Sequence, residues 1–149
     1  MKKIFILFCA AIILAGGVAA AKYLSYSQTE AAAQEVGDKV DELDGVAVYY
    51  NGRISNVSGR NTAPGGYNLG QKYQCVEFVK RYYFEALGHK MPNPWGHAKN
   101  FYDPAVADCR PNPARGLTQY RNGGRGRPQA EYLIVFGGGM YGHVAIISE

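Results

Sequence analysis

The stretch that decides the fold is QKYQCVEFVKRYYFEALGHK, residues 71–90. Cys75, Val79, Tyr82 and Ala86 recur at intervals of three or four residues, which places them on one face of an α-helix. Gly88 follows, and glycine commonly ends a helix in the left-handed conformation. The spacing therefore predicts an amphipathic helix whose apolar face packs inward and whose first turn carries Cys75.

The start of a helix is a favourable place for a reactive thiol. The helix dipole and the free N–H groups of the first turn favour the thiolate, which is the nucleophilic form of cysteine. The same N–H groups can bind the oxyanion of a tetrahedral intermediate. The sequence therefore predicts Cys75 as a candidate nucleophile, which would need an imidazole within hydrogen-bond reach.

The sequence contains three histidines that could supply this imidazole. His89 follows the far end of the same helix, roughly 20 Å from Cys75 at about 1.5 Å of rise per residue, and is too distant. His97 lies in a Trp-Gly-His-Ala turn, and His143 begins an apolar segment after a glycine-rich turn. The pattern favours His143 as the base and leaves His97 as the alternative.

The segments before residue 71 are predicted from propensity and turn residues. Residues 22–45 are expected to form an N-terminal helical segment, with a helix over 29–43 that Gly45 ends. Residues 46–57 are expected to form a β-hairpin that turns at Asn51-Gly52. Residues 58–71, rich in Gly, Asn and Pro, are expected to be a loop.

The segments after the central helix alternate between turns and apolar runs. Residues 93–103 predict a turn and a short helix, and 104–129 predict a loop. Residues 132–136 and 143–148 predict two strands joined through a glycine-rich turn. The order of helices, hairpins and strands is typical of the α+β class.

The N-terminus has the three-part pattern of a secretory signal. Lys2 and Lys3 precede an apolar run over 4–15, and small residues follow at 18–21. An uncleaved anchor is the alternative, because residues 4–21 are uncharged and long enough to cross a bilayer. The sequence predicts a signal peptide over 1–21 and export to the periplasm, envelope or medium, with membrane contact only if this segment is retained.

Charge and cysteine content narrow the choice of partners. The formal net charge is +4, which falls to +2 when Lys2 and Lys3 leave with the signal, so nucleic acid is not predicted as a partner. The arginine-rich residues 115–128 are predicted to be a solvated loop, and bidentate pairing of these arginines with carboxylates of peptidoglycan stem peptides is the alternative for an exported protein. Cys75 and Cys109 remain, and a disulfide between them is an alternative interpretation. No close pair has zinc-ligand spacing, so no metal site is predicted.

Two motifs resemble the CHAP family, the cysteine- and histidine-dependent amidohydrolases and peptidases. They are YQCVEFVKRYY at 73–83 and YGHVAIIS at 141–148, and they are similar in particular to the amidase domain of glutathionylspermidine enzymes. The resemblance implies a papain-like α+β fold, with a nucleophile helix packed on an antiparallel sheet. It implies Cys75 as nucleophile, His143 as general base and no cofactor.

The remaining candidate site residues flank these two motifs. Gln74 and Gln71 are candidates for the oxyanion hole, beside the backbone N–H groups. The candidate residues of a substrate groove are Tyr67, Asn68, Trp95 and His97.

The resemblance also carries a departure at the C-terminal end. The family's third residue, which orients the histidine, lies on a strand after the histidine strand. Glu149 would lie roughly 20 Å from His143 at about 3.3 Å per residue, too far to act. The CHAP domain, residues 46–149, is therefore expected to be truncated and to lack its last strand or strands.

Two functions are predicted from these observations. The first is a secreted cysteine amidohydrolase or endopeptidase that cleaves amide bonds, most plausibly in peptidoglycan peptides. The alternative is a truncated, inactive CHAP domain that binds the cell wall or a partner protein. The oligomeric state is not predicted.

Overall fold

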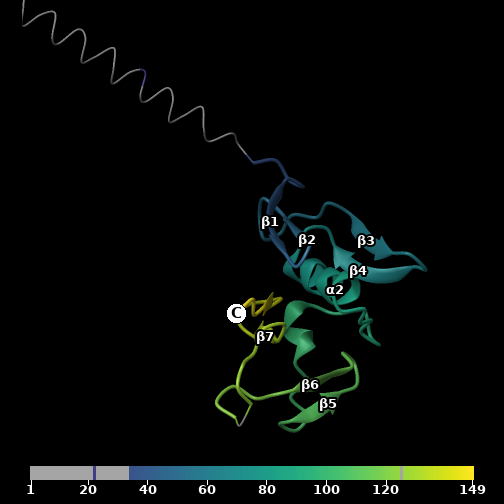
Figure 1. Ribbon diagram of the computed structural model, residues 1–149, viewed down its shortest axis with the longest axis vertical. Coiled ribbons are helices and arrows are strands. Elements are labelled where there is room, and N and C mark those ends of the chain that lie inside the picture. The colour runs from purple at the N-terminus through teal and green to yellow at the C-terminus, as the bar shows by residue number, and fades with distance from the viewer. Residues whose placement is uncertain (1–21, 23–33, 125) are drawn as a thin grey trace, which may run out of the picture. The chain divides into compact units, whose positions relative to one another are not determined.

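The computed structural model describes residue 22, residues 34–124 and residues 126–149 of the chain (Figure 1). Residues 35–149 form one compact unit, which begins earlier than the predicted domain boundary at residue 46. The predicted signal peptide lies outside the described residues. Within the described residues, no helix is both long enough and apolar enough to cross a membrane.

The first element is a hairpin rather than the end of a helix. Strand β1 (Lys39–Leu43) pairs antiparallel with β2 (Val46–Tyr49), and Leu43 lies opposite Val46. Asp44 and Gly45 have φ values of 48° and 81°, which is typical of a two-residue type I′ turn. The prediction of helix up to residue 43 was wrong for β1, because Asp-Gly turn chemistry overrides helix propensity there. Residues 29–33 lie outside the described part.

A second hairpin replaces the loop predicted over 58–71. Strand β3 (Arg60–Ala63) pairs antiparallel with β4 (Tyr67–Gln71). The hairpin predicted over 46–57 was also wrong, because β2 pairs with β1 and Asn51-Gly52 lies in an irregular segment. In β4, a Cβ on Gly70 would lie 3.1 Å from Glu77 Cα, so glycine allows this strand to approach the first turn of the central helix.

The central helix is confirmed. Helix α2 (Cys75–Glu85) buries Val79 and Tyr82 almost completely. At its far end Gly88 has a φ of 63°, and the His89 amide donates to the Tyr83 carbonyl at 2.8 Å. The glycine therefore turns the chain away from the helix axis.

The C-terminal segments form short elements. The predicted short helix is the 3₁₀ helix η1 (Ala98–Phe101), and the predicted loop over 104–129 contains the hairpin of β5 (Arg110–Asn112) and β6 (Leu117–Gln119). The two predicted strands are confirmed as β7 (Leu133–Phe136) and β8 (His143–Ile146), an antiparallel pair.

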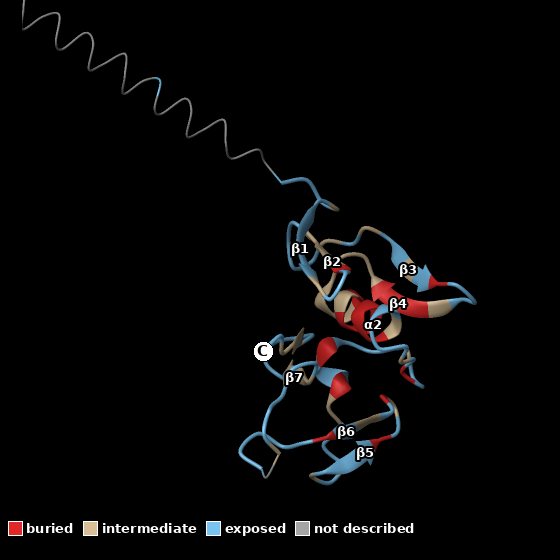
Figure 2. Cartoon of the chain, viewed as in Figure 1, coloured by how far each residue is buried: buried red, intermediate tan, exposed pale blue. Residues whose placement is uncertain are grey.

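One buried cluster joins these elements. Helix α2 packs against β2, β4 and β8, and most of its buried face appears red in Figure 2. The buried hydrophobic residues of the cluster are Val46, Val79, Tyr82, Tyr83, Met91, Ala98, Phe101 and Val144. The chain therefore has the predicted α+β class. In the described residues the strands form four antiparallel pairs, and the three strands that pack on the helix, β2, β4 and β8, belong to three different pairs.

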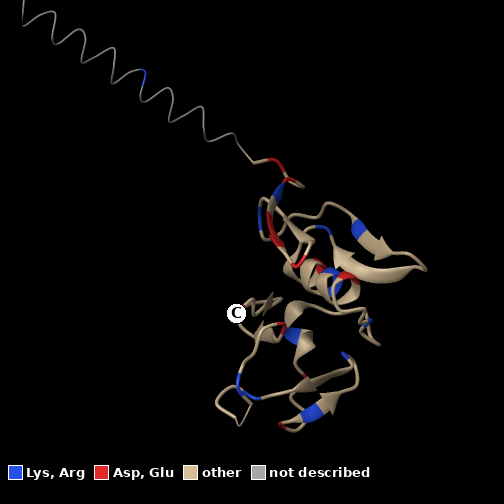
Figure 3. Cartoon of the chain, viewed as in Figure 1, with Lys and Arg blue, Asp and Glu red and all other residues tan. Residues whose placement is uncertain are grey.

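Helix α2 carries both acidic and basic residues (Figure 3). Three of them, Glu77, Lys80 and Arg81, have buried side chains. Arg81 Nε lies 2.7 Å from Glu77 Oε1, and Asn61 Nδ2 donates to the same oxygen at 2.7 Å. Arg81 Nη2 donates to the Ala47 carbonyl at 2.8 Å. Since both charges are paired and hydrogen-bonded, they link the helix to β2 and β3 without leaving a buried charge unpaired.

Lys80 is the buried cation of α2 that pairs with carbonyls instead of a carboxylate. Its side chain is 1 % exposed, and Nζ donates to the carbonyls of Asn68 and Pro94. Burial, with smaller contributions from the charges of Arg115 and Arg60, lowers the pKa of Lys80 to about 8. The ammonium therefore tethers β4 and the segment around residue 94 to the helix at a cost in desolvation.

This lowered pKa predicts a pH-dependent stability. The unfolded chain retains the Lys80 proton up to its ordinary pKa of 10.5, whereas the folded chain releases it from about 8. Between these values the unfolded state binds more protons, so the free energy of unfolding rises with pH. From about pH 7.5 to pH 9.5 we expect the parent to gain on the order of 1 kcal/mol relative to Lys80→Met. Urea unfolding of both chains at each pH measures this difference.

The tyrosines of α2 limit the pH range over which the free energy of unfolding rises. Burial raises the pKa of Tyr83 to about 12 and raises that of Tyr82 as well. Above their ordinary pKa of 10.0 the unfolded chain loses these protons first, so stability falls as pH rises further. A parent that gains nothing relative to Lys80→Met below about pH 9.5 contradicts the lowered pKa of Lys80.

Candidate active site

Cys75 is the first residue of α2, as predicted. It is half-buried and packs against the central cluster, which includes Val144 of β8. The first backbone hydrogen bond of the helix runs from the Phe78 amide to the Gln74 carbonyl at 3.1 Å. In the described part of the chain, the amides of Cys75, Val76 and Glu77 therefore have no backbone acceptor, as expected for the first turn of a helix.

Gln74 and Gln71 differ in what they can contribute to an oxyanion hole. Gln74 Nε2 donates to the carbonyls of Ile54 (3.1 Å) and Asn56 (2.6 Å), so this side chain is committed to the preceding loop. Gln71 ends β4, and its carbonyl accepts the Gln74 amide at 3.0 Å. The backbone amides of the first helical turn are therefore better available to an oxyanion than the Gln74 side chain.

His143 is the first residue of β8 and is exposed. It lies opposite Phe136 of β7, with the two ring centroids 6.0 Å apart. Because β8 packs on α2 through Val144, the histidine strand and the cysteine helix share one core. Among the described residues no hydrogen bond joins His143 to Cys75, and such contacts commonly tighten only when substrate binds.

The turn before His143 is docked on η1. The Lys99 amide donates to the Tyr141 carbonyl at 3.0 Å. Gly142 has a φ of 71°, and a Cβ there would lie 2.5 Å from the Phe136 carbonyl oxygen and 2.9 Å from the Lys99 amide nitrogen. Glycine is therefore required for this approach, which fixes the chain one residue before the histidine.

The structure brings His97 close to the same turn. His97 is exposed at the start of η1, and its amide donates to Asn100 Oδ1 at 2.8 Å. Its ring lies 4.7 Å from that of Tyr141, two residues before His143. Trp95 lies two residues before His97 and is 59 % exposed. His97 therefore lies against the turn before His143, and Trp95 is exposed nearby in the chain; the substrate groove stays a prediction.

Tyr67 and Asn68, the other groove candidates, are engaged within the fold. The Tyr67 hydroxyl accepts the Met91 amide at 2.9 Å, and burial raises its pKa. Asn68 is 6 % exposed and donates to the Pro94 carbonyl at 3.0 Å. The polar groups of both side chains therefore bind the backbone at Met91 and Pro94 and are not free to contact a substrate.

Arg115 was assigned to a solvated loop, and that prediction was wrong for this residue. It is 3 % exposed and donates to the carbonyls of Asn93 (2.7 Å), Trp95 (3.1 Å) and Asn100 (3.0 Å). Its guanidinium carbon lies 4.2 Å from the centroid of the Phe101 ring. Arg115 therefore holds the segment that carries Trp95 and His97, a role that its glycine-rich sequence context does not indicate.

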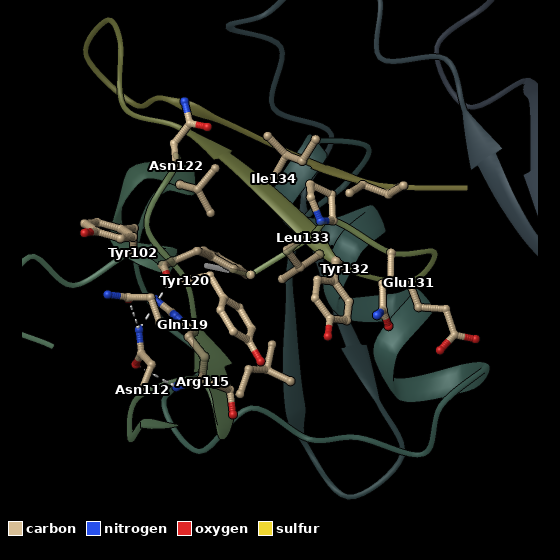
Figure 4. Close-up of a pocket in the computed structure, with 18 of the residues that line it drawn as sticks. Tyr102, Asn112, Arg115, Gln119, Tyr120, Asn122, Glu131, Tyr132, Leu133 and Ile134 are labelled. Carbon is tan, nitrogen blue, oxygen red and sulfur yellow. Dashed lines mark hydrogen bonds between the residues drawn. The ribbon is translucent and has the colours of Figure 1, made fainter. Parts of the chain in front are cut away.

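A cavity of about 1250 Å³ opens beside β7 and the loop before it (Figure 4). Its wall includes the rings of Tyr120 and Tyr132, which stack with centroids 5.9 Å apart, and a hydrogen bond of 3.0 Å between Asn112 and Gln119. Neither Cys75 nor His143 lines it. The candidate active site therefore lies elsewhere, at the start of α2 and β8.

Cys75 and Cys109 are both free thiols, and Cys109 is exposed, so the alternative of a disulfide between them does not occur in this structure. Over residues 34–124 and 126–149, no group of three or more His, Cys, Asp or Glu side chains is placed to hold a metal ion.

Comparison with known proteins supplies the family. The chain is 30 % identical to trypanothione synthetase of Crithidia fasciculata over 112 residues, which is 70 % of this chain and 16 % of that protein. It therefore corresponds to a small part of the relative's length. No solved structure matches significantly. The family model of the CHAP domain matches residues 65–149, which include both Cys75 and His143. A match over more than half of the chain shows that it belongs to the CHAP domain family.

Proposed function

We propose that the protein is an exported cysteine amidohydrolase or endopeptidase that cleaves amide bonds in peptidoglycan peptides. Membership of the CHAP family supports an amide hydrolase in general. The observation that carries the cysteine mechanism is the position of Cys75 at the unsatisfied amino end of α2, against the strand that begins with His143.

The proposed chemistry has two steps. The Cys75 thiolate attacks the amide carbonyl, and first-turn amides stabilise the resulting oxyanion. The His143 imidazolium then protonates the leaving amine as the C–N bond breaks, which gives a thioester. The neutral imidazole next removes a proton from water as the water oxygen attacks the thioester carbonyl. The C–S bond then breaks, which releases the acid and restores the Cys75 thiolate and the His143 imidazolium.

The substrate class rests on two expectations from the sequence. The predicted signal over residues 1–21 supports export, and cross-linked peptidoglycan peptides are an abundant amide polymer outside the cytoplasm. The exposed ring of Tyr141, two residues before the proposed base, and the exposed ring of Trp95 favour an extended substrate lying across the surface.

The proposal is tested by digestion of purified peptidoglycan with the full chain under reducing conditions. We expect soluble fragments whose masses identify one cleaved amide bond, and we expect no fragments after prior alkylation with iodoacetamide. Cleavage of glycosidic bonds, or equal release by the alkylated protein, would contradict a cysteine amidohydrolase.

A second candidate is an inactive CHAP domain that binds the wall or a partner. The observation that supports this second function is that no hydrogen bond joins Cys75 to His143 in the described residues. For this function we expect the folded chain to sediment with peptidoglycan and to release no fragments. If the protein both sediments with peptidoglycan and releases fragments from it, the result supports the enzymatic function instead.

A further inference from the structure

An exposed arginine and an exposed tryptophan form a pair at one edge of the groove. Arg60 is the first residue of β3, and its guanidinium carbon lies 5.0 Å from the centroid of the Trp95 ring. Trp95 is 59 % exposed, so the pair faces solvent. Stacking on an aromatic face holds a guanidinium flat and leaves its N–H edges free to donate.

The donors of Arg60 are only partly used. Nη1 donates to Asn68 Oδ1 at 2.9 Å, and Asn68 is itself buried and fixed by its bond to the Pro94 carbonyl. In the part of the chain that the structure describes, no other acceptor contacts the guanidinium, and neither ion pair includes Arg60. Arg60 is thus oriented by the protein but not neutralised by it.

Two buried cations strengthen the positive potential behind this pair. Lys80 Nζ donates to the Pro94 carbonyl at 2.8 Å, and Arg115 Nη2 donates to the Trp95 carbonyl at 3.1 Å. Both satisfy backbone carbonyls, so their charge is not cancelled by an acid at that segment. The charges of Arg115 and Arg60 also contribute, after burial, to the lowered pKa of Lys80. The segment around Trp95 therefore attracts an anion.

The pair is linked to the helix that carries the proposed nucleophile. Asn68, which anchors Arg60, accepts a hydrogen bond from Lys80 Nζ through its carbonyl, and Lys80 lies five residues after Cys75 in α2.

Exposed rings connect the pair with the proposed base. Trp95 precedes His97 by two residues, and the His97 ring packs on Tyr141, two residues before His143. Two side-chain contacts and two steps of two residues along the chain therefore connect Arg60 with His143. A peptide bound along these residues would place a side group against Arg60 while its amide lies near the histidine.

We propose that Arg60 and Trp95 form a subsite for a carboxylate of the peptide substrate. The planar guanidinium binds the carboxylate through its free N–H edge, and the indole packs against the adjoining methylene groups. This inference rests on the proposed function and specifies its substrate as an acidic peptide.

Binding without cleavage tests the subsite by itself. The probes are two stem peptides that differ only in D-glutamate, with a free α-carboxylate, or D-isoglutamine, in which that group is an amide. Calorimetry with full-length Cys75→Ala is expected to show at least about 10-fold tighter binding of the D-glutamate peptide. Adding Arg60→Gln is expected to abolish this preference. Arg53→Gln, a nearby exposed arginine, is the matched control and is expected to preserve it.

Three results would overturn the subsite: equal binding of the two peptides, binding of neither, or a preference that survives Arg60→Gln. Arg60→Lys keeps the charge without the planar fork, and we expect it to retain only part of the preference. If Arg60→Gln fails to fold by circular dichroism, an undiminished preference in Arg60→Lys overturns the proposal instead.

Hydrolysis by the parent chain separates this inference from the proposed function. We expect the parent to cleave the D-glutamate peptide with the higher kcat/KM, and Arg60→Gln to lower kcat/KM for that peptide alone. If the parent cleaves neither peptide while Cys75→Ala retains the binding preference, the subsite stands and the enzymatic function fails.

Discussion

Replacing Cys75 with alanine is expected to lower kcat/KM for amide hydrolysis by at least about 10⁴-fold, because the proposed mechanism has no nucleophile without the thiolate. The chain offers a matched control in Cys109, which is a free thiol on an exposed loop. Cys109→Ala is expected to leave the rate unchanged. Initial rates on a soluble stem peptide, with substrate varied, give kcat/KM for both variants.

The same assay decides between the two candidate bases. His143→Ala is expected to reduce kcat by about 10²- to 10⁴-fold. His97→Ala is expected to raise KM with a smaller effect on kcat, because the His97 ring packs on Tyr141, two residues before the proposed base. A folded Cys75→Ala variant that retains its activity contradicts the mechanism. If only His97→Ala shows a large loss of kcat, His97 is the general base instead of His143.

Replacing Gly142 with alanine is expected to cause the largest loss of structure. The residue has a φ of 71°, and its Cβ would lie 2.5 Å from the Phe136 carbonyl oxygen and 2.9 Å from the Lys99 amide nitrogen. The turn must therefore separate from η1 or from β7. We expect the free energy of unfolding to fall by about 2–4 kcal/mol. We expect kcat to fall by roughly 100-fold or more, because the histidine moves with the turn.

Gly138 provides the control within the same turn. A Cβ on Gly138 would meet no atom within 4 Å, and its φ lies outside the left-handed region. Gly138→Ala is therefore expected to match the parent in urea unfolding and in kcat. Equal behaviour of the two alanine variants would show that the contact between the turn and η1 does not position His143.

The elements that could be predicted from sequence are those whose own residues form a clear apolar pattern. Helix α2 carries a helical period of apolar residues, and β7 and β8 are apolar runs separated by glycines. Each of these signals is local and strong, because hydrophobic burial supplies most of the stability of such elements. Their positions agree with the predictions to within a few residues.

The strands that were not predicted are stabilised by hydrogen bonds to a partner strand instead of by burial of their own side chains. Strand β1 is almost fully exposed, so its sequence shows no apolar face, and the two-residue turn at Asp44-Gly45 determines its conformation. Strand β3 is largely polar and depends on β4 for its hydrogen bonds. Propensity within one segment could not reveal these strands, since the partner segment supplies the stabilising contacts.

The same distinction holds for the candidate site. Cys75 and His143 were identified from their motifs, and the structure places them on packed elements. Arg115 and Arg60 were not assigned to the site, because their roles depend on contacts with Asn68 and the segment around Trp95. No local pattern signals that an arginine will meet backbone carbonyls or an indole ring from another part of the chain.

The stacked pair of Arg60 and Trp95 gives this protein a built-in optical reporter. The sequence contains one tryptophan, so all indole emission comes from a ring that lies 5.0 Å from the Arg60 guanidinium. An anion that arrives at that guanidinium changes the local field and the hydration of the exposed indole. Titration followed by emission wavelength therefore reads occupancy of this one position without a label, and stopped-flow mixing can time substrate arrival separately from bond cleavage.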